Sequence, residues 1–101
     1  MNALVVIPTY NEADNIEALA HAVLNQAALN ANLLIVDDNS PDGTGDIVDR
    51  LKELPCNIGR LHILHRPSKC GLGRAYLAGF AWALEHGYEC VIEMDADFSH
   101  D

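Results

Sequence analysis

The sequence predicts an α/β fold in which helices cover both faces of one parallel sheet. Four short apolar runs alternate with segments whose apolar residues recur every three to four positions. Strands that alternate with helices form βαβ units, and right-handed crossovers with one reversal of winding direction give the strand order 3-2-1-4. Such a Rossmann-like sheet binds its ligands beyond the carboxyl ends of the strands, where the winding reverses.

The first strand is predicted over residues 3–7, where a continuous apolar run stops at Pro8. A helix is predicted over residues 16–27, because its apolar side chains fall at i, i+3, i+4, i+7, i+8 and i+11. Asn11 is the predicted N-cap of this helix, and acidic residues in the first turn suit the positive end of the helix dipole.

The second strand, over residues 33–36, is followed by a dense cluster of turn-forming residues at 37–43. The second helix is expected over residues 46–54 and the third strand over residues 60–64. The side chains of the second helix expected to face the core are Ile47, Val48, Leu51 and Leu54.

The third helix is predicted over residues 72–86, with Gly87 in the position of a left-handed C-cap. The fourth strand, over residues 91–94, leads directly into Asp95-Ala96-Asp97. The inward stripe of the third helix is expected to consist of Leu72, Ala75, Tyr76, Gly79, Phe80 and Ala83.

Composition narrows the class of protein. A chain of 101 residues is the size of one domain, and 50% hydrophobic residues exclude a disordered chain. A formal net charge of −9 argues against nucleic acid as a partner. No apolar run reaches the roughly 20 residues that cross a bilayer, no signal peptide is evident, and three cysteines without a CxxC motif are typical of reduced thiols in the cytoplasm.

Acidic residues follow three of the four predicted strands. The first strand leads into a turn without glycine, which disfavours a dinucleotide-binding fold. Carboxylates gathered at one edge repel each other, and a divalent cation such as Mg²⁺ or Mn²⁺ is the simplest compensation. The pair Asp37-Asp38 has an alternative role as a cap for the following turn. The acidic residues expected near this edge are Glu12, Asp37, Asp38, Asp42, Asp95 and Asp97.

Four segments together resemble the signatures of the dolichol-phosphate (polyprenyl-phosphate) mannosyltransferases, which are inverting family 2 glycosyltransferases with the GT-A fold. The resemblance begins at about Leu4 and continues to the last residue. Its segments are VIPTYNE at 6–12, VDDNSPDGT at 36–44, KCGLG at 69–73 and MDADFSH at 94–100. Ser99 departs from the family pattern, in which this position is often Gln.

The resemblance implies a role for each matching position. Asp95 and Asp97 would hold Mg²⁺ or Mn²⁺ and serve catalysis, with the backbone of Ala96 alongside. The turn at residues 71–73 would lie close to the donor. The residues implied to bind the nucleotide sugar are Pro8, Tyr10, Glu12, Val36, Asp38, Lys69, Asp95, Ala96 and Asp97.

The implied reaction transfers mannose from GDP-mannose to a polyprenyl phosphate at the cytoplasmic face of the membrane. Residues 1–101 are expected to be the nucleotide-sugar-binding half of the GT-A domain, inactive alone because the acceptor half is absent. The fourth strand would then be an exposed apolar edge that favours self-association. The alternatives are a family 2 transferase that uses UDP-glucose or another nucleotide sugar, and a non-catalytic nucleotide-binding fragment.

Overall fold

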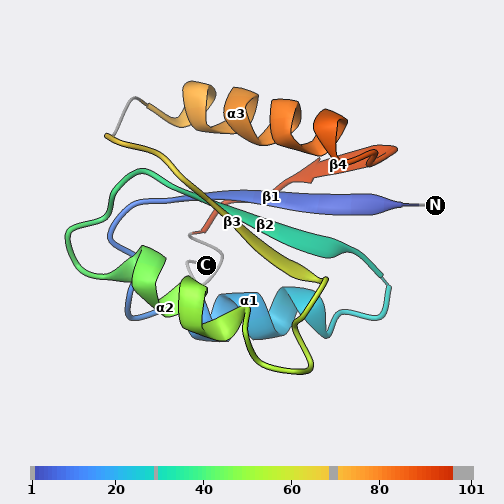
Figure 1. Cartoon of the computed structure of the whole chain (residues 1–101), viewed down its shortest axis with the longest axis horizontal. Coiled ribbons are helices and arrows are strands. Elements are labelled where there is room, and N and C mark those ends of the chain that lie inside the picture. Colours follow the sequence, from blue (N-terminus) through green and yellow to red (C-terminus); the bar gives the residue numbers. More distant parts are fainter. Residues whose placement is uncertain (1, 29, 69–70, 97–101) are drawn as a thin grey trace.

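A computed structural model describes residues 2–28, 30–68 and 71–96, which form three layers with the sheet in the middle (Figure 1). The helices and strands alternate along the chain, as the sequence predicts. Their bounds are β1 (Ala3–Thr9), α1 (Ile16–Leu24), β2 (Asn32–Asp37), α2 (Thr44–Leu51), β3 (Leu61–His65), α3 (Leu72–Glu85) and β4 (Cys90–Glu93).

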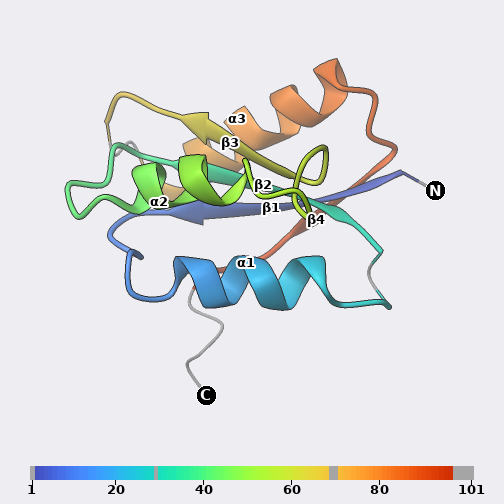
Figure 2. The same cartoon turned by 60° about the horizontal axis from the view of Figure 1, so that its bottom comes forward.

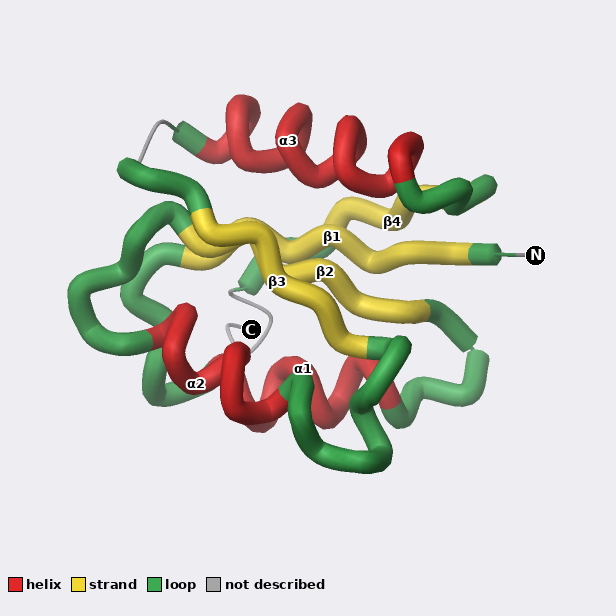
Figure 3. Tube along the Cα trace, viewed as in Figure 1, coloured by secondary structure: helices red, strands yellow, loops and turns green. Residues whose placement is uncertain are grey.

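The sheet is parallel throughout and has the order β3-β2-β1-β4, which confirms the predicted topology. Helices α1 and α2 cover one face and α3 covers the other (Figures 1 and 3). In Figure 2, α1 lies below β1, and α2 lies in front of the strands on the side of β3. The winding therefore reverses between β1 and β4, and the carboxyl ends of the strands lie at the same edge.

Two hydrophobic cores explain why the strands are continuous apolar runs. Along β1, Val5 and Ile7 pack in the core under α1 and α2, whereas Leu4 and Val6 pack in the core under α3. All four side chains have an exposed fraction of 0%. Because successive side chains of a strand point to opposite faces, a strand covered on both sides needs apolar residues at every position.

Helix α3 packs closely on β1 at Gly79. A Cβ atom added there would lie 2.5 Å from Cγ1 of Val6 and 3.4 Å from Cγ2 of Val36. The absent side chain thus allows the helix backbone to lie directly on the side chains of two neighbouring strands.

Several predicted details at the helix ends are wrong. Asn11 is not the N-cap of α1, because it adopts a left-handed conformation with φ of 58° and Asn15 occupies the cap position. Helix α1 ends at Leu24, since the side-chain amide of Asn25 donates to the carbonyl oxygen of His21 at 2.8 Å. Gly87 has φ of 77°, as predicted for a residue that ends α3.

Two predicted core residues are also exposed. Leu54 is 45% exposed, because α2 ends at Leu51 and the following tight turn directs Leu54 away from the sheet. Leu72 is 57% exposed, because α3 makes its close contact with the sheet one to two turns later, at Ala75 and Gly79.

Among the described residues, no helix has both the length and the apolar composition needed to cross a bilayer.

Candidate functional site at the carboxyl edge of the sheet

The loops that follow β1 and β2 are joined by three hydrogen bonds. Backbone N–H groups of residues 11–13 donate to Oγ of Ser40, Oγ1 of Thr44 and Oδ2 of Asp42, in that order. The donor–acceptor distances are 2.9 to 3.0 Å. Turns that are about 30 residues apart in sequence therefore form one continuous rim beside the carboxyl ends of β1 and β2.

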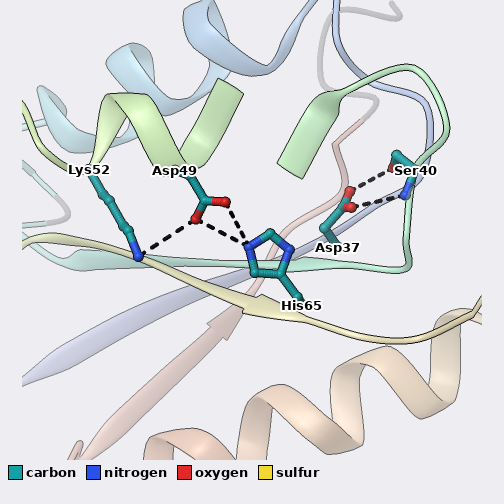
Figure 4. A network of polar contacts seen from close by, with 5 residues as sticks. All are labelled: Asp37, Ser40, Asp49, Lys52 and His65. Atoms are coloured by element: carbon teal, nitrogen blue, oxygen red, sulfur yellow. Dashed lines mark hydrogen bonds and ion pairs between the residues drawn. The ribbon is translucent and has the colours of Figure 1, made fainter. Parts of the chain in front are cut away.

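Asp37, the last residue of β2, stabilises this rim through hydrogen bonds with Thr9 and Ser40. Its Oδ1 accepts a hydrogen bond from Oγ1 of Thr9 at 2.7 Å. Figure 4 shows the two hydrogen bonds from Ser40, whose Oγ donates to Oδ1 at 2.6 Å and whose N–H donates to Oδ2 at 3.0 Å. The side chain is buried. With three donors already bound, Asp37 has the capping role that the sequence left open.

Asp42 has a similar structural role. It accepts hydrogen bonds from the N–H and the hydroxyl of Thr44 as well as from Ala13. The hydrogen bond from the Thr44 hydroxyl is the largest influence on the pKa of Asp42, which is lowered from its ordinary value. The hydrogen bonds keep this carboxylate charged without a metal ion.

Of the six carboxylates expected near this edge, Asp37 and Asp42 already accept hydrogen bonds, both from Ser40 and Thr44 nearby in the chain and from Thr9 and Ala13 of the preceding segment. Within residues 2–28, 30–68 and 71–96, no three His, Cys, Asp or Glu side chains lie close enough together to hold a metal ion.

Asp38 lies opposite Arg66, a residue that the sequence analysis did not single out. Oδ1 of Asp38 is 3.3 Å from Nη1 of Arg66, and the two side chains are 7% and 15% exposed. The guanidinium N–H is not aimed at the oxygen, so the contact is an ion pair without a hydrogen bond. Within the described part of the chain, these two atoms are buried without a hydrogen-bond partner.

The topology could have predicted this pair. In a sheet with neighbouring strands β3, β2 and β1, the residue after β3 lies beside the residue after β2. His65 pairs with Asp37 in the register of the sheet, and the N–H of Arg66 donates to the carbonyl oxygen of Asp37 at 2.8 Å. Arg66 is therefore placed next to Asp38 by backbone pairing alone.

His65 supports the rim from the side of α2. Nε2 of His65 lies 3.0 Å from a carboxylate oxygen of Asp49, which also pairs with Lys52 at 3.6 Å (Figure 4). The imidazole packs on Gly45, where an added Cβ atom would lie 2.9 Å from Cε1 of the ring. His65 thus packs on the first turn of α2 at Gly45 and pairs with Asp49 further along the same helix.

The sequence-predicted binding residues differ in their exposure. Tyr10 is 36% exposed, and Glu12 is partly buried in the same loop. Pro8 and Val36 are paired in the register of β1 and β2, and both are buried. The side chain of Val36 packs in the core under α3, so only its backbone faces the edge where a ligand would lie.

The end of β4 supplies the remaining predicted residues. Asp95 is exposed, Ala96 is 4% exposed, and Lys69 and Asp97 lie outside the described residues. The carboxylate of Asp95 makes no hydrogen bond or ion pair with any residue that the structure describes. A free, exposed carboxylate is the type of hard oxygen ligand that Mg²⁺ and Mn²⁺ prefer, so Asp95 fits the proposed metal.

Tyr76 of α3 lies next to this segment. Its hydroxyl donates to the carbonyl oxygen of Met94 at 3.3 Å, and the N–H of Met94 donates to the carbonyl oxygen of Val6 at 3.1 Å. Burial raises the pKa of the Tyr76 phenol, and the negative charges of Asp95 and Glu93 raise it further. The phenol therefore keeps its proton and acts as a donor at neutral pH.

Cavities of the described structure lie at the rim and beside α1, where one of about 430 Å³ separates α1 from α2. A pocket of about 170 Å³ lies at the rim and is lined in part by Asp37, Ser40, His65 and Arg66. A larger pocket of about 680 Å³ lies along α1, from Asp14 to Arg60. Arg66 lines the smaller pocket, whereas Asp38 and Asp95 do not, so this pocket adjoins the candidate site.

The fold defines a Rossmann-like α/β domain with a parallel sheet of order β3-β2-β1-β4, and comparison with known proteins identifies its family. Residues 4–101 match glycosyl transferase family 2, and the chain belongs to this family.

Two curated relatives are each 50% identical to this chain. One is a polyprenol monophosphomannose synthase of Mycolicibacterium smegmatis, matched over 96% of this chain and 36% of the relative. The other is an undecaprenyl-phosphate mannosyltransferase of Micrococcus luteus, matched over 99% of this chain and 40% of the relative. The chain thus spans well under half the length of either protein.

Solved structures of GT-A glycosyltransferases share the fold. The mannosyltransferase PcManGT of Pyrobaculum calidifontis, solved with GDP-Man and Mn²⁺, superposes with a TM-score of 0.70 at 29% identity, over 95% of this chain and 27% of that one. S. aureus TarS residues 1–349, solved with UDP-GlcNAc, superposes with a TM-score of 0.74 at 25% identity, over 96% of this chain and 27% of that one.

Proposed function

We propose that this chain supplies the nucleotide-sugar-binding part of a metal-dependent mannosyltransferase that transfers mannose from GDP-mannose to a polyprenyl phosphate. The observation that carries the proposal is the 50% identity, over nearly the whole chain, to two proteins named for mannosyl transfer to polyprenol lipids. In this proposal, residues 1–101 are the nucleotide-sugar-binding half of a GT-A domain. The arrangement of polar groups at the carboxyl edge of the sheet is consistent with this function.

Asp38 and Arg66 recognise the nucleobase in this proposal. A buried carboxylate oxygen without a hydrogen-bond partner favours a ligand that brings N–H donors, and the edge of guanine carries such donors. The buried guanidinium N–H offers a donor to a base oxygen in the same place. Tyr10 and Glu12, together with the backbone at Pro8 and Val36, surround the base and the ribose.

Asp95 and Asp97 would hold Mn²⁺ or Mg²⁺, and Ala96 and Lys69 would contribute to binding of the donor. The metal ion, when bound, stabilises the negative charge that develops on the leaving diphosphate. An oxygen of the acceptor phosphate forms a bond to the anomeric carbon of mannose as the bond to GDP breaks, which inverts the configuration. Since that phosphate is already an anion, these residues need to orient the donor but need not remove a proton.

A second candidate is a family 2 transferase that uses a uridine nucleotide sugar such as UDP-glucose. The structural similarity to a protein solved with UDP-GlcNAc favours this alternative. Uracil also carries an N–H that could donate to Asp38. The lower sequence identity to that protein, compared with the mannosyl relatives, ranks this candidate second.

The lipid acceptor suggests where the enzyme acts, and the edge of the sheet suggests how it associates. We propose that the enzyme acts at the cytoplasmic face of a membrane, because the relatives are named for lipid phosphates embedded in one. We also propose self-association through β4, which is an edge strand of the described sheet. Sedimentation velocity at tens of micromolar tests the second point, and a strictly monomeric protein would contradict it.

Thermal-shift titrations with GDP-mannose, UDP-glucose, GDP and UDP, each with and without Mn²⁺, test the choice of donor. We expect the largest Mn²⁺-dependent rise of the unfolding midpoint with the guanosine compounds. A larger rise with the uridine compounds would favour the second candidate. No response to any nucleotide would contradict both.

A further inference from the structure

Met94, the residue before Asp95, forms a hydrogen bond with each of its backbone polar groups. One partner belongs to the sheet and the other to the helix that covers it. The N–H of Met94 donates to Val6 of β1, and its carbonyl oxygen accepts the hydrogen bond of the Tyr76 phenol of α3. Strand pairing ends just before this point, because Glu93 is the last residue of β4 in register with β1. The Tyr76 hydroxyl is thus the side-chain contact that holds the segment as it leaves the sheet.

The position of the Tyr76 ring is fixed by the side chains around it. Tyr76 packs against the core under α3, and its ring lies stacked on Phe80 with a centroid distance of 6.3 Å. One turn later, Gly79 brings α3 into direct contact with Val6. The close packing of Gly79 on Val6 therefore fixes α3 on the sheet one turn away from Tyr76.

We propose that Tyr76 is a positioning residue for the metal site: its hydroxyl fixes the Met94 backbone from which the Asp95 carboxylate projects. The inference rests on the proposed function, since it needs Asp95 to bind the metal ion. Tyr76 does not touch the metal or the nucleotide in this proposal. Its contribution is that the carboxylate is already in position before the cation binds, so less ordering is needed on binding.

The test is Tyr76→Phe, which removes the hydroxyl and keeps the ring. The matched control is Tyr88→Phe, because Tyr88 accepts a hydrogen bond from Asn32 at 2.8 Å beyond the opposite end of α3. Two affinities are measured by isothermal titration calorimetry for each protein. They are the affinity for Mn²⁺ in the presence of GDP and the affinity for GDP without metal.

We expect Tyr76→Phe to weaken Mn²⁺ binding about two- to tenfold, as the loss of one hydrogen bond implies. GDP binding without metal should stay unchanged, because Asp38 and Arg66 do not depend on this hydroxyl. Tyr88→Phe should change neither affinity. A merely structural role of Tyr76 would instead lower both affinities together, which would overturn the inference.

Two further outcomes separate this inference from the proposed function. If the parent protein binds Mn²⁺ with GDP and Tyr76→Phe binds it equally well, the positioning role is wrong and the proposed function stands. If the parent protein shows no Mn²⁺-dependent binding of GDP, the proposed function fails, and the inference fails with it. Thermal unfolding of both variants checks that each is folded under the conditions of the titration.

Discussion

The guanidinium group of Arg66 lies 3.3 Å from the carboxylate of Asp38 at the carboxyl edge of the sheet, where Asp38 is buried and Arg66 is largely covered. Neither of the two facing atoms has a hydrogen-bond partner among the described residues. Burying two charges costs solvation free energy, which their mutual attraction offsets only in part. A pair of this kind is consistent with the proposal that Asp38 and Arg66 bind a nucleobase.

Arg66→Met should lower the free energy of unfolding by about 3 kcal/mol, because it leaves the Asp38 carboxylate buried without its counter-charge. The double variant Arg66→Met with Asp38→Asn should recover most of that loss, since no uncompensated charge remains. Urea denaturation of the two variants and the parent measures both values. A single variant as stable as the parent would mean that the pair is not buried in solution.

Gly79→Ala should lower the free energy of unfolding by about 1–3 kcal/mol, because the added Cβ atom would lie 2.5 Å from Val6. Gly73→Ala in the same helix is the matched control, since an added Cβ atom meets nothing within 4 Å there. The control should gain up to about 1 kcal/mol from the better helix propensity of alanine. Equal effects of the two substitutions would contradict the close contact between α3 and β1.

His62 should make the protein less stable in mild acid. Burial lowers the pKa of His62 below its ordinary value of 6.5, and the nearby His86 and Lys52 add to this effect, although a hydrogen bond with the Gly59 backbone opposes it. The unfolded chain therefore takes up a proton that the folded chain resists, so stability is fully present above pH 6.5 and falls as the pH drops below it.

His62→Phe keeps a ring beside Trp82, which lies at a centroid distance of 5.0 Å, and removes the titrating group. We expect the variant to lose less stability than the parent between neutral and mildly acidic pH. Thermal unfolding midpoints measured over this range provide the comparison. Parallel pH profiles for the two proteins would show that His62 does not contribute.

The pattern of apolar residues was sufficient to predict the strands, because a sheet covered on both faces imposes a continuous apolar run on each strand. Right-handed crossovers with one reversal of winding direction then gave their order. The details at the ends of the helices were not predictable in the same way. Asn11 has the chemistry of an N-cap, but its N–H binds Ser40 of a neighbouring loop, and that contact places Asn11 outside the helix. Such a contact exists only once the chain has folded.

In the candidate site, too, some features were predictable from the sequence and others depend on contacts made in the folded chain. Asp38 and Asp95 were predicted from their positions after two strands, and the structure places both at the carboxyl edge. Asp37 has the same residue type as Asp38, but three hydrogen bonds from Thr9 and Ser40 give it a structural role. Adjacent carboxylates differ here because successive side chains point in different directions, and their neighbours come from other strands.

The central claim is that residues from separate turns bind one nucleotide sugar together with one divalent cation. Isothermal titration of the protein with GDP-mannose, with and without Mn²⁺, tests it most directly when Asp95→Ala and Asp38→Ala are measured alongside. We predict that Mn²⁺ strengthens binding to the parent, that Asp95→Ala abolishes this gain, and that Asp38→Ala weakens binding in both conditions. Binding that is independent of Mn²⁺ in the parent and unchanged in both variants would contradict the claim.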